Sequence, residues 1–434
     1  VTVVQSDADV RRLPSALNPA AGSPGIGSTF LPAKQRPVSD DQRAWHATVP
    51  VHLDDDDPSL LVALGGNIGQ ARPEARGFRL FLAEPGRIIA GRDILNLDFE
   101  IQHVAAEQAS VVRAGRDFIY TPNRDLAGNL AQSQQERFQG ALFSGPGRGF
   151  VLAGRNIDLG TSDGIVSVGN LRNFALPDSG ASLHVFAGAG EGPDLARFYA
   201  RYLRDLPATS ADAVPYLQAL VGKELSADGA ASMFKDLEAA RRALAEAGVA
   251  PGARDVDLDL GSAPSERLLA LFFGEIERAG VVATTTGSDD YSRGFAAIET
   301  LFPGKGREGA LSLLLSRIHT EDGGDINLYV PGGSANTGAA ATASVTKSEN
   351  ELGVVVQSEG DVRGFVRDDF LVNASRVFAL QGGDILLWAS EGDIDAGSGA
   401  KSALAAPPPQ VVFDPASGQF VTVFPPEVAG SGIR

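Results

Sequence analysis

The sequence contains no cysteine, which excludes disulfide scaffolds, cysteine-ligated zinc sites and thiol catalysis. Its five histidines (His46, His52, His103, His184 and His319) lie too far apart to form a local two-histidine metal motif. Basic residues are also scarce, with 37 Lys and Arg against 54 Asp and Glu, a net charge of −17. This balance argues against nucleic-acid binding, because phosphate contacts need clustered Lys and Arg.

Long apolar runs are missing too. No stretch approaches the roughly 18 residues of a membrane-spanning helix, and no signal peptide is visible. The sequence starts at Val1, and its single methionine is Met233. We therefore expect an internal piece of a longer product, with any targeting signal outside it. Hydrophobic residues make up 43%, enough for a real core, while 51 Gly and 25 Pro predict many turns.

One short motif recurs, in which Gly and an Asp or Asn precede an apolar residue that begins a β-type segment. Glycine is expected to supply a positive φ at a corner, and Asp or Asn to bond local backbone N–H groups. Repeated corner-plus-strand units predict stacked coils, so the fold class is mainly β, a right-handed parallel β-helix. A β-sandwich is less favoured, because Asn-Gly hairpin signals do not recur regularly along the chain. The motif occupies residues 91–94, 115–118, 154–157, 324–326, 360–362, 383–385 and 392–394.

The middle of the chain has a different pattern, with helices predicted at 193–203, 230–247 and 263–279. Ser262 is the expected N-cap of the last helix and Gly280 its end. The predicted organisation has five parts. They are an irregular leading segment (1–57), the first part of the β-helix (58–190), a mostly helical insertion (191–305), the second part of the β-helix (306–405), and a Pro-rich tail with a short strand pair (406–434).

Three patterns that resemble functional motifs are better explained by local structure. Residues 160–164 fit G-x-S-x-G, but β-type segments lie on both sides, whereas a nucleophile elbow needs a following helix. Asp255, Asp257, Asp259 and Glu266 resemble a calcium loop, yet Leu260 stands where that loop requires Gly. The acidic run 54–57 is expected to be solvated. We predict no metal or cofactor residue, with calcium as the less favoured alternative.

An enzyme on this scaffold would need acids and bases on one outer groove. Asp98, Glu100 and Arg113 lie in neighbouring predicted coils, and Trp388 has a side chain able to stack on a sugar. Charged residues on the outer face of any solenoid give the same pattern, and a packing role for Trp388 is favoured. No catalytic residue is predicted.

Five stretches of the chain carry a resemblance to a known family. They are residues 291–298, 301–304, 323–333, 382–399 and 405–408. These stretches resemble the C-terminal region of large exoproteins of the filamentous haemagglutinin family. The resemblance implies a secreted or surface-exposed, outer-membrane-associated β-helical protein of Gram-negative bacteria. It also implies export by two-partner secretion through a dedicated outer-membrane β-barrel transporter. The family's N-terminal secretion domain has no counterpart here, and the family offers no catalytic residues for this region.

The sequence therefore predicts a non-enzymatic structural or adhesive module of an exoprotein, which mediates attachment or presents another function. The expected partners are the transporter and a receptor or glycan on a host or neighbouring cell, with no nucleic acid and no transmembrane segment in this chain. Two alternatives stay open: a carbohydrate-active lyase or hydrolase on a β-helix, and a surface receptor or signalling component. The helical insertion is the expected recognition element, because insertions in solenoids commonly form the binding face.

Overall fold

The computed structural model describes residues 2–5, 57–70, 78–122, 140–170, 176–204, 258–304, 306–338, 347, 352–397, 410–414, 419–423 and 432–434. The chain forms two units. The first comprises Val1–Gly190 and Arg307–Arg434, and the second comprises Glu191–Gly306. The predicted helix 230–247 and most of segment 1–57 lie outside the described residues.

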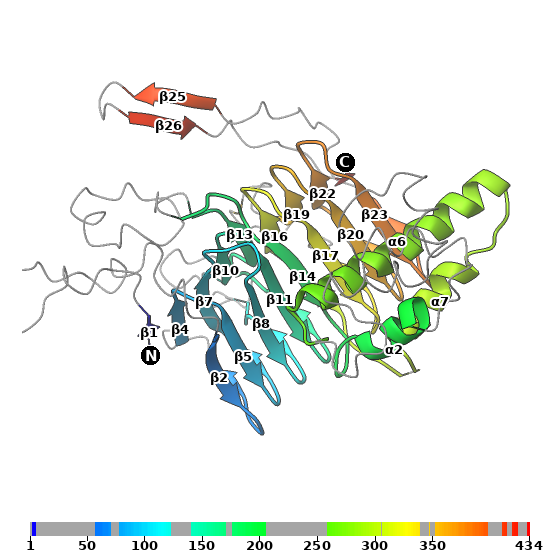
Figure 1. Cartoon of the computed structure of the whole chain (residues 1–434), viewed down its shortest axis with the longest axis horizontal. Helices are drawn as coiled ribbons and strands as arrows, with labels where there is room; N and C mark the ends of the chain where they lie inside the picture. The colour runs from blue at the N-terminus through cyan, green and yellow to red at the C-terminus, as the bar shows by residue number, and fades with distance from the viewer. Residues whose placement is uncertain are drawn as a thin grey trace, which may run out of the picture. The chain divides into compact units, whose positions relative to one another are not determined.

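The first unit is built from three parallel sheets whose strands lie side by side in chain order, as the colours in Figure 1 show for the labelled strands. Neighbours in each sheet differ by three in strand number, except β22 and β27 at the end of the nine-stranded sheet, so each coil contributes one strand to every sheet. The structure thus confirms the predicted fold class, a parallel β-helix. Outside these sheets, β25 (Gln410–Asp414) pairs antiparallel with β26 (Gln419–Val423).

Sheet 1 has nine strands: β1 (Thr2–Val4), β4 (Phe78–Leu82), β7 (Leu97–Gln102), β10 (Ala141–Ser144), β13 (Ile165–Val168), β16 (Arg317–Thr320), β19 (Gly353–Val356), β22 (Arg376–Ala379) and β27 (Gly432–Ile433). Sheet 2 has eight: β2 (Ser59–Ala63), β5 (Gly86–Ala90), β8 (Ala109–Ala114), β11 (Arg148–Ala153), β14 (Ser182–Phe186), β17 (Ile326–Val330), β20 (Val362–Val366) and β23 (Ile385–Ala389). Sheet 3 has eight two-residue strands: β3 (Ile68–Gly69), β6 (Ile94–Leu95), β9 (Phe118–Ile119), β12 (Ile157–Asp158), β15 (Leu311–Ser312), β18 (Ala335–Asn336), β21 (Phe370–Leu371) and β24 (Ile394–Asp395).

The core runs along the inside of the coil as columns of aliphatic side chains. In sheet 2 one column consists of Ile88, Val112, Val151, Val185 and Leu328, each in register with the next and each almost completely buried. Burying one such side chain stabilises the fold by about 1.5–3 kcal/mol. A coil therefore gains its core energy only when another coil stacks on it.

Outward positions in the middle of sheet 2 are apolar as well, which the expected alternation of polar and apolar residues does not predict. The rings of Phe186 and Tyr329 stack with centroids 4.2 Å apart, and those of Phe150 and His184 with centroids 4.6 Å apart. All four side chains are buried. Near-continuous apolar strands of this kind are typical of parallel sheets buried on both faces.

The second unit contains α2 (Leu195–Tyr199), the π-helix η2 (Ala200–Arg204), α6 (Ala263–Thr286) and α7 (Ser292–Leu301). The first helix is shorter than predicted, because the segment passes into the π-helix. The predicted end of α6 at Gly280 is wrong. The helix continues to Thr286, where Gly287, at φ 63°, donates its N–H to the carbonyl of Ala283 and forms the cap.

Two further features were not predicted from the sequence. Leu314 adopts a φ of 52° and turns the chain between β15 and β16. Helix α7 was not predicted from the pattern of its residues. Ser262, by contrast, caps α6 as predicted, its Oγ accepting the N–H of Ser265 at 3.3 Å.

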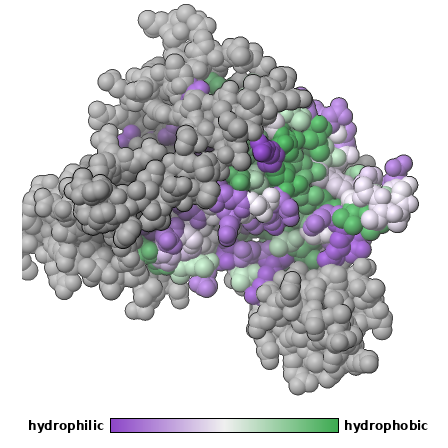
Figure 2. Space-filling model, turned by 90° about the horizontal axis from the view of Figure 1, so that it is seen from above, coloured by the Kyte–Doolittle hydropathy of each residue, from purple (hydrophilic) through white to green (hydrophobic). Residues whose placement is uncertain are grey.

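The described surface mixes hydrophilic side chains with an apolar patch (Figure 2). None of the helices in the described part of the chain combines the length and apolar character needed to cross a lipid bilayer.

A buried ion group joins α6 to α7. Glu275, 1% exposed, accepts a hydrogen bond at 2.8 Å from Arg278 and another at 2.8 Å from Arg293 of α7. Removing the carboxylate leaves two guanidinium groups without their buried partner. Glu275→Ala should therefore lower the free energy of unfolding of the second unit by about 3–5 kcal/mol. Hydrogen-exchange protection of the α6 amides measures this loss. Exposed Glu277→Ala is the matched control, and equal effects of the two substitutions would contradict the assignment.

Candidate functional site at the corners of the coil

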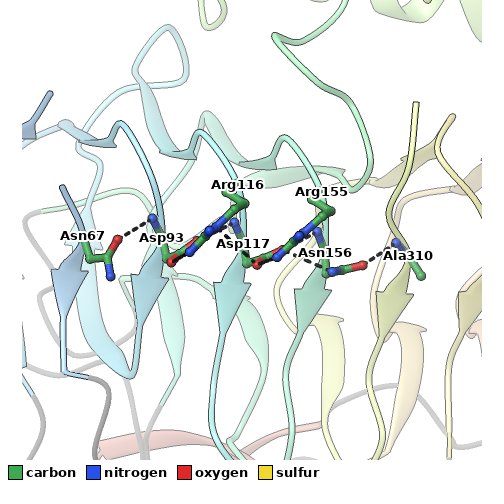
Figure 3. Close-up of polar contacts among 7 residues, drawn as sticks. All are labelled: Asn67, Asp93, Arg116, Asp117, Arg155, Asn156 and Ala310. Carbon is green, nitrogen blue, oxygen red and sulfur yellow. Dashed lines mark hydrogen bonds and ion pairs between the residues drawn. The ribbon is translucent and has the colours of Figure 1, made fainter. Parts of the chain in front are cut away.

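A row of polar side chains follows the tight corner that precedes sheet 3 (Figure 3). We call Asn67, Asp93, Asp117, Asn156 and Ala310 the first corner ladder. Each later member donates its backbone N–H to Oδ1 of the residue one coil earlier, at 3.1, 3.3, 3.0 and 3.1 Å in turn. These bonds satisfy N–H groups that lie between strands and have no place in a sheet ladder.

Two arginines reinforce this ladder across adjacent coils. The Nε of Arg116 donates to Oδ1 of Asp93 at 2.7 Å, and that of Arg155 donates to Oδ1 of Asp117 at 2.9 Å. A second nitrogen of each guanidinium contacts the other carboxylate oxygen, so both pairs are bidentate. The arginine side chains are about half exposed, whereas both carboxylates are buried.

The carboxylates of the ladder stay ionised. The hydrogen bond from Arg116 is the main reason that the pKa of Asp93 is lowered. Burial acts to raise the pKa of Asp117, but the bonds from Arg155 and Asn156 outweigh it and the net shift is downward. Neither group is therefore suited to act as a general acid near neutral pH.

The glycines of these corners are required for a reason other than the predicted one. Gly91, Gly115 and Gly154 do not adopt positive φ, so that expectation is wrong for them. Instead the coils approach closely. A Cβ atom on Gly115 would lie 2.4 Å from the carbonyl oxygen of Gly91, and one on Gly154 would lie 2.2 Å from that of Gly115. Positive φ does occur at Gly324 and Gly360, in the later form of the motif.

Three of the later Gly-Asp motifs serve a different corner, the one that precedes sheet 2, whereas the motif at 392–394 precedes β24 of sheet 3. We call Ser182, Asp325, Asp361 and Asp384 the second corner ladder. Asp325 donates its N–H to Ser182 Oγ at 3.1 Å, and the next two steps to carboxylate Oδ1 atoms measure 2.9 and 2.8 Å. Arg363 bridges Asp325 and Asp361. One sequence motif thus supports two corners of the same coil.

A Ser–His pair that sequence reasoning missed lies inside the rod. Ser110 Oγ is 2.7 Å from His103 Nε2, while His103 Nδ1 is 2.8 Å from the carbonyl oxygen of Pro146. Ser110 Oγ also accepts the N–H of Gly86 at 2.9 Å. This contact resembles a nucleophile and its base, but both residues are completely buried and burial lowers the pKa of His103 to about 4. The pair fixes backbone geometry, and a substrate cannot reach it.

The structure does not bring the candidate enzyme residues together. Asp98 and Glu100 lie on β7 in sheet 1, whereas Arg113 lies on β8 in sheet 2. Asp98 is buried, accepts the N–H of Gly140 at 3.2 Å and lies 3.7 Å from Nε of Arg79. Trp388, on β23, donates its ring N–H to Ser390 Oγ at 3.0 Å.

The remaining motif residues also have local roles where they are described. Ser162 of the G-x-S-x-G stretch is buried in a turn between β12 and β13, and its Oγ donates to the carbonyl of Leu159 at 2.7 Å. Glu266 lies in the first turn of α6, while Asp255 and Asp257 lie outside the described residues. Within the described ranges no group of three or more His, Asp or Glu could hold a metal ion.

The close approach of the coils generates one prediction. Gly115→Ala should lower the free energy of unfolding of the β-helix by about 1–3 kcal/mol, because the new methyl group meets backbone rather than a flexible side chain. Denaturant unfolding measures the change. Gly274→Ala in α6 is the control, since a Cβ there has no neighbour within 4 Å and should be neutral or stabilising. Equal destabilisation by both substitutions would contradict the steric account.

Buried His103 generates a second prediction. Its pKa is lowered in the folded chain, so its stabilising contribution is complete above pH 6.5 and is lost as the pH falls from 6.5 toward 4. Between these two pH values the unfolded chain binds a proton at this histidine and the folded chain does not. The free energy of unfolding therefore falls by roughly 3 kcal/mol by the time the pH reaches 4. The free energy of unfolding of His103→Gln should therefore vary less between pH 7 and 4.5 than that of the unmodified chain. Asp322, whose pKa burial raises to about 6, acts in the opposite direction but is present in both proteins. Identical pH profiles would refute the assignment.

Comparison with known proteins gives one match. Residues 382–434 match the sequence model of the family described as "Filamentous haemagglutinin family outer membrane protein". No curated protein and no solved structure matches the chain. The matched residues include the last coil with Asp384 and Trp388, and β27. The resemblance predicted for this region is confirmed: over residues 382–434, at its C-terminal end, the chain is similar to the filamentous haemagglutinin family.

Proposed function

We propose that this chain is a non-enzymatic structural and adhesive module of a secreted or cell-surface exoprotein exported by two-partner secretion. In this proposal the β-helix is a scaffold and the second unit recognises a receptor or glycan on a host or neighbouring cell. The family match at residues 382–434 supports the exoprotein assignment. The transporter would be an outer-membrane β-barrel that handles the chain during export.

The observation that carries the proposal is the use of charged groups at the corners. Asp93, Asp117, Asp325 and Asp361 bind backbone N–H groups and arginines of neighbouring coils. Such carboxylates fix the register of the rod. Catalysis would instead need acids and bases that converge on a substrate. The buried Ser110–His103 pair follows the same principle, since both side chains are occupied by structural bonds.

The second unit is proposed as the recognition element because it interrupts the repeat between β14 and β15. Its α7 exposes Tyr291 and Phe295, 39% and 45% accessible and one helical turn apart. Exposed aromatic residues are common anchors in binding surfaces. The nearby arginines Arg278 and Arg293 are engaged with buried Glu275, which leaves acidic groups to dominate the charge of this region.

The net charge of −17 should repel anionic cell surfaces unless divalent cations bridge them. We therefore expect adhesion that needs both a divalent cation and the second unit. Beads coated with the chain should bind target cells in calcium or magnesium buffer and detach in excess chelator. A variant lacking 191–306 should lose binding in either buffer, and its circular dichroism should still show a β-rich fold.

Three outcomes would contradict the proposal. Adhesion unchanged by chelator would remove the cation bridge, and adhesion unchanged by the deletion would remove the second unit as the recognition element. Sustained release of oligosaccharides from acidic or neutral polysaccharides would establish the carbohydrate-active alternative. A variant with Tyr291→Ser and Phe295→Ser provides a smaller change should the deletion fail to fold. It is expected to weaken adhesion several-fold, with Val281→Ser, at another exposed apolar residue, as its matched control.

A further inference from the structure

The last coil ends in two strands that no strand in the described part of the chain covers. In β23 every residue is only partly buried, and in β24 both residues are exposed, Ile394 at 44%. Sheet 1 alone continues for one more strand, because β27 pairs with β22. Sheets 2 and 3 therefore end one strand earlier, with the backbone edge of a parallel sheet facing outward.

The two corners of this last coil carry carboxylates with a defined geometry. The N–H of Asp384 is bound by Asp361 Oδ1 at 2.8 Å, and the N–H of Asp393 by Asp369 Oδ1 at 2.9 Å. Each carboxylate of the preceding coil thus accepts the N–H of the coil that follows. Asp384 and Asp393 occupy the same ladder positions and are exposed. They are placed to accept N–H groups from a further coil that runs parallel and in register.

The first coil offers the complementary edge. Strands β2 and β3 begin sheets 2 and 3, and Asn67 is the first member of the first corner ladder. No described residue precedes Asn67 in that ladder. On β2 the inward-facing Leu61 and Ala63 are only partly buried, whereas Ile88 and Ala90, their partners in the next coil, are almost completely buried. This edge presents the backbone and the Gly-Asn-Ile corner that the last coil is placed to receive.

Sheet 1 sets a condition on such stacking. At the first coil its place is filled by β1, where Val3 is in register with Leu80, and beyond the last coil by β27, where Ile433 is in register with Val377. Placing β2 and β3 of one copy against β23 and β24 of another leaves a single place in sheet 1 for two strands. One of the two strands must then leave, either β1 of one copy or β27 of the other.

We propose that the open end formed by β23 and β24 binds a second copy of this chain head to tail, through β2 and β3. In this contact Asp393 accepts the backbone N–H of Asn67 of the incoming coil, and β27 takes the place of β1. Pro58 falls opposite Asp384 in the register of sheet 2 and has no N–H, so Asp384 takes no part. The contact is heterologous and does not close, so repeated association gives an open filament. In the free chain, β1 occupies this place in sheet 1 and prevents the first coil from pairing with another copy. This inference does not depend on the proposed adhesive function.

The test uses the full chain and variants, followed by sedimentation velocity and negative-stain electron microscopy over a range of concentrations. Removing residues 1–5 should promote head-to-tail assembly at several-fold lower concentration than the full chain requires. Val3→Asp, which weakens β1 without shortening the chain, should act in the same direction. Adding Asp393→Lys to either variant should weaken assembly at least several-fold, because a lysine cannot accept the N–H of the incoming Asn67.

Exposed Glu359→Lys, in an interior coil, is the charge-matched control and should leave assembly intact. Circular dichroism establishes that each variant keeps its β-rich fold. The proposal is overturned if the variants without β1 stay monomeric at every concentration, which would mean that the chain's own residues or another partner fill the edge. Assembly that is unchanged by Asp393→Lys would also overturn it, because the contact would then use another surface.

Discussion

The structure depends on one backbone constraint. In a parallel β-helix the strand amides find partners in the adjacent coil, but an amide at a corner lies between two sheets and needs an acceptor from elsewhere. Here the acceptor is a side-chain oxygen one coil earlier, from Asn67 to Asp93 to Asp117 and onward. A corner residue without such an oxygen interrupts the series. Ala310 does so where the chain returns from the second unit, although its own N–H still bonds Asn156.

This constraint explains which features could be read from the sequence. The Gly-Asp motif predicts stacked corners because both of its residues have a backbone role, and that part of the prediction is confirmed. The role given to glycine was wrong at Gly91, Gly115 and Gly154, since the distance between coils appears only after folding. The sequence also did not show that the same motif occurs at two different corners of the coil. Sequence spacing records that a corner exists, whereas the sheet that follows it depends on how many residues each coil uses.

The candidate site shows the same limit. His103 and Ser110 are seven residues apart, and nothing in their spacing shows that the coil folds them back onto each other with Pro146 and Gly86 as further partners. Conversely, Asp98 and Glu100 are close to Arg113 in sequence but lie on a different sheet from it. Helix α6 extends past Gly280 because an exposed helical glycine costs only about 1 kcal/mol, while Gly287 supplies a cap with a left-handed φ.

A β-helix whose corners are bonded from coil to coil can accept inserted segments without a change in the register of its strands. The chain leaves after β14 and returns at β15, yet β12 and β15 are adjacent in sheet 3 and Ala310 still meets Asn156. The second unit holds itself together separately, through buried Glu275 and its two arginines. The bonds that fix the register of the coils and those that join α6 to α7 in the second unit therefore use different residues. The corners fix the stacking through groups that are buried or paired, and an inserted unit can change its surface without disturbing a single ladder bond. A scaffold with this property suits a protein whose role is to carry and present variable parts.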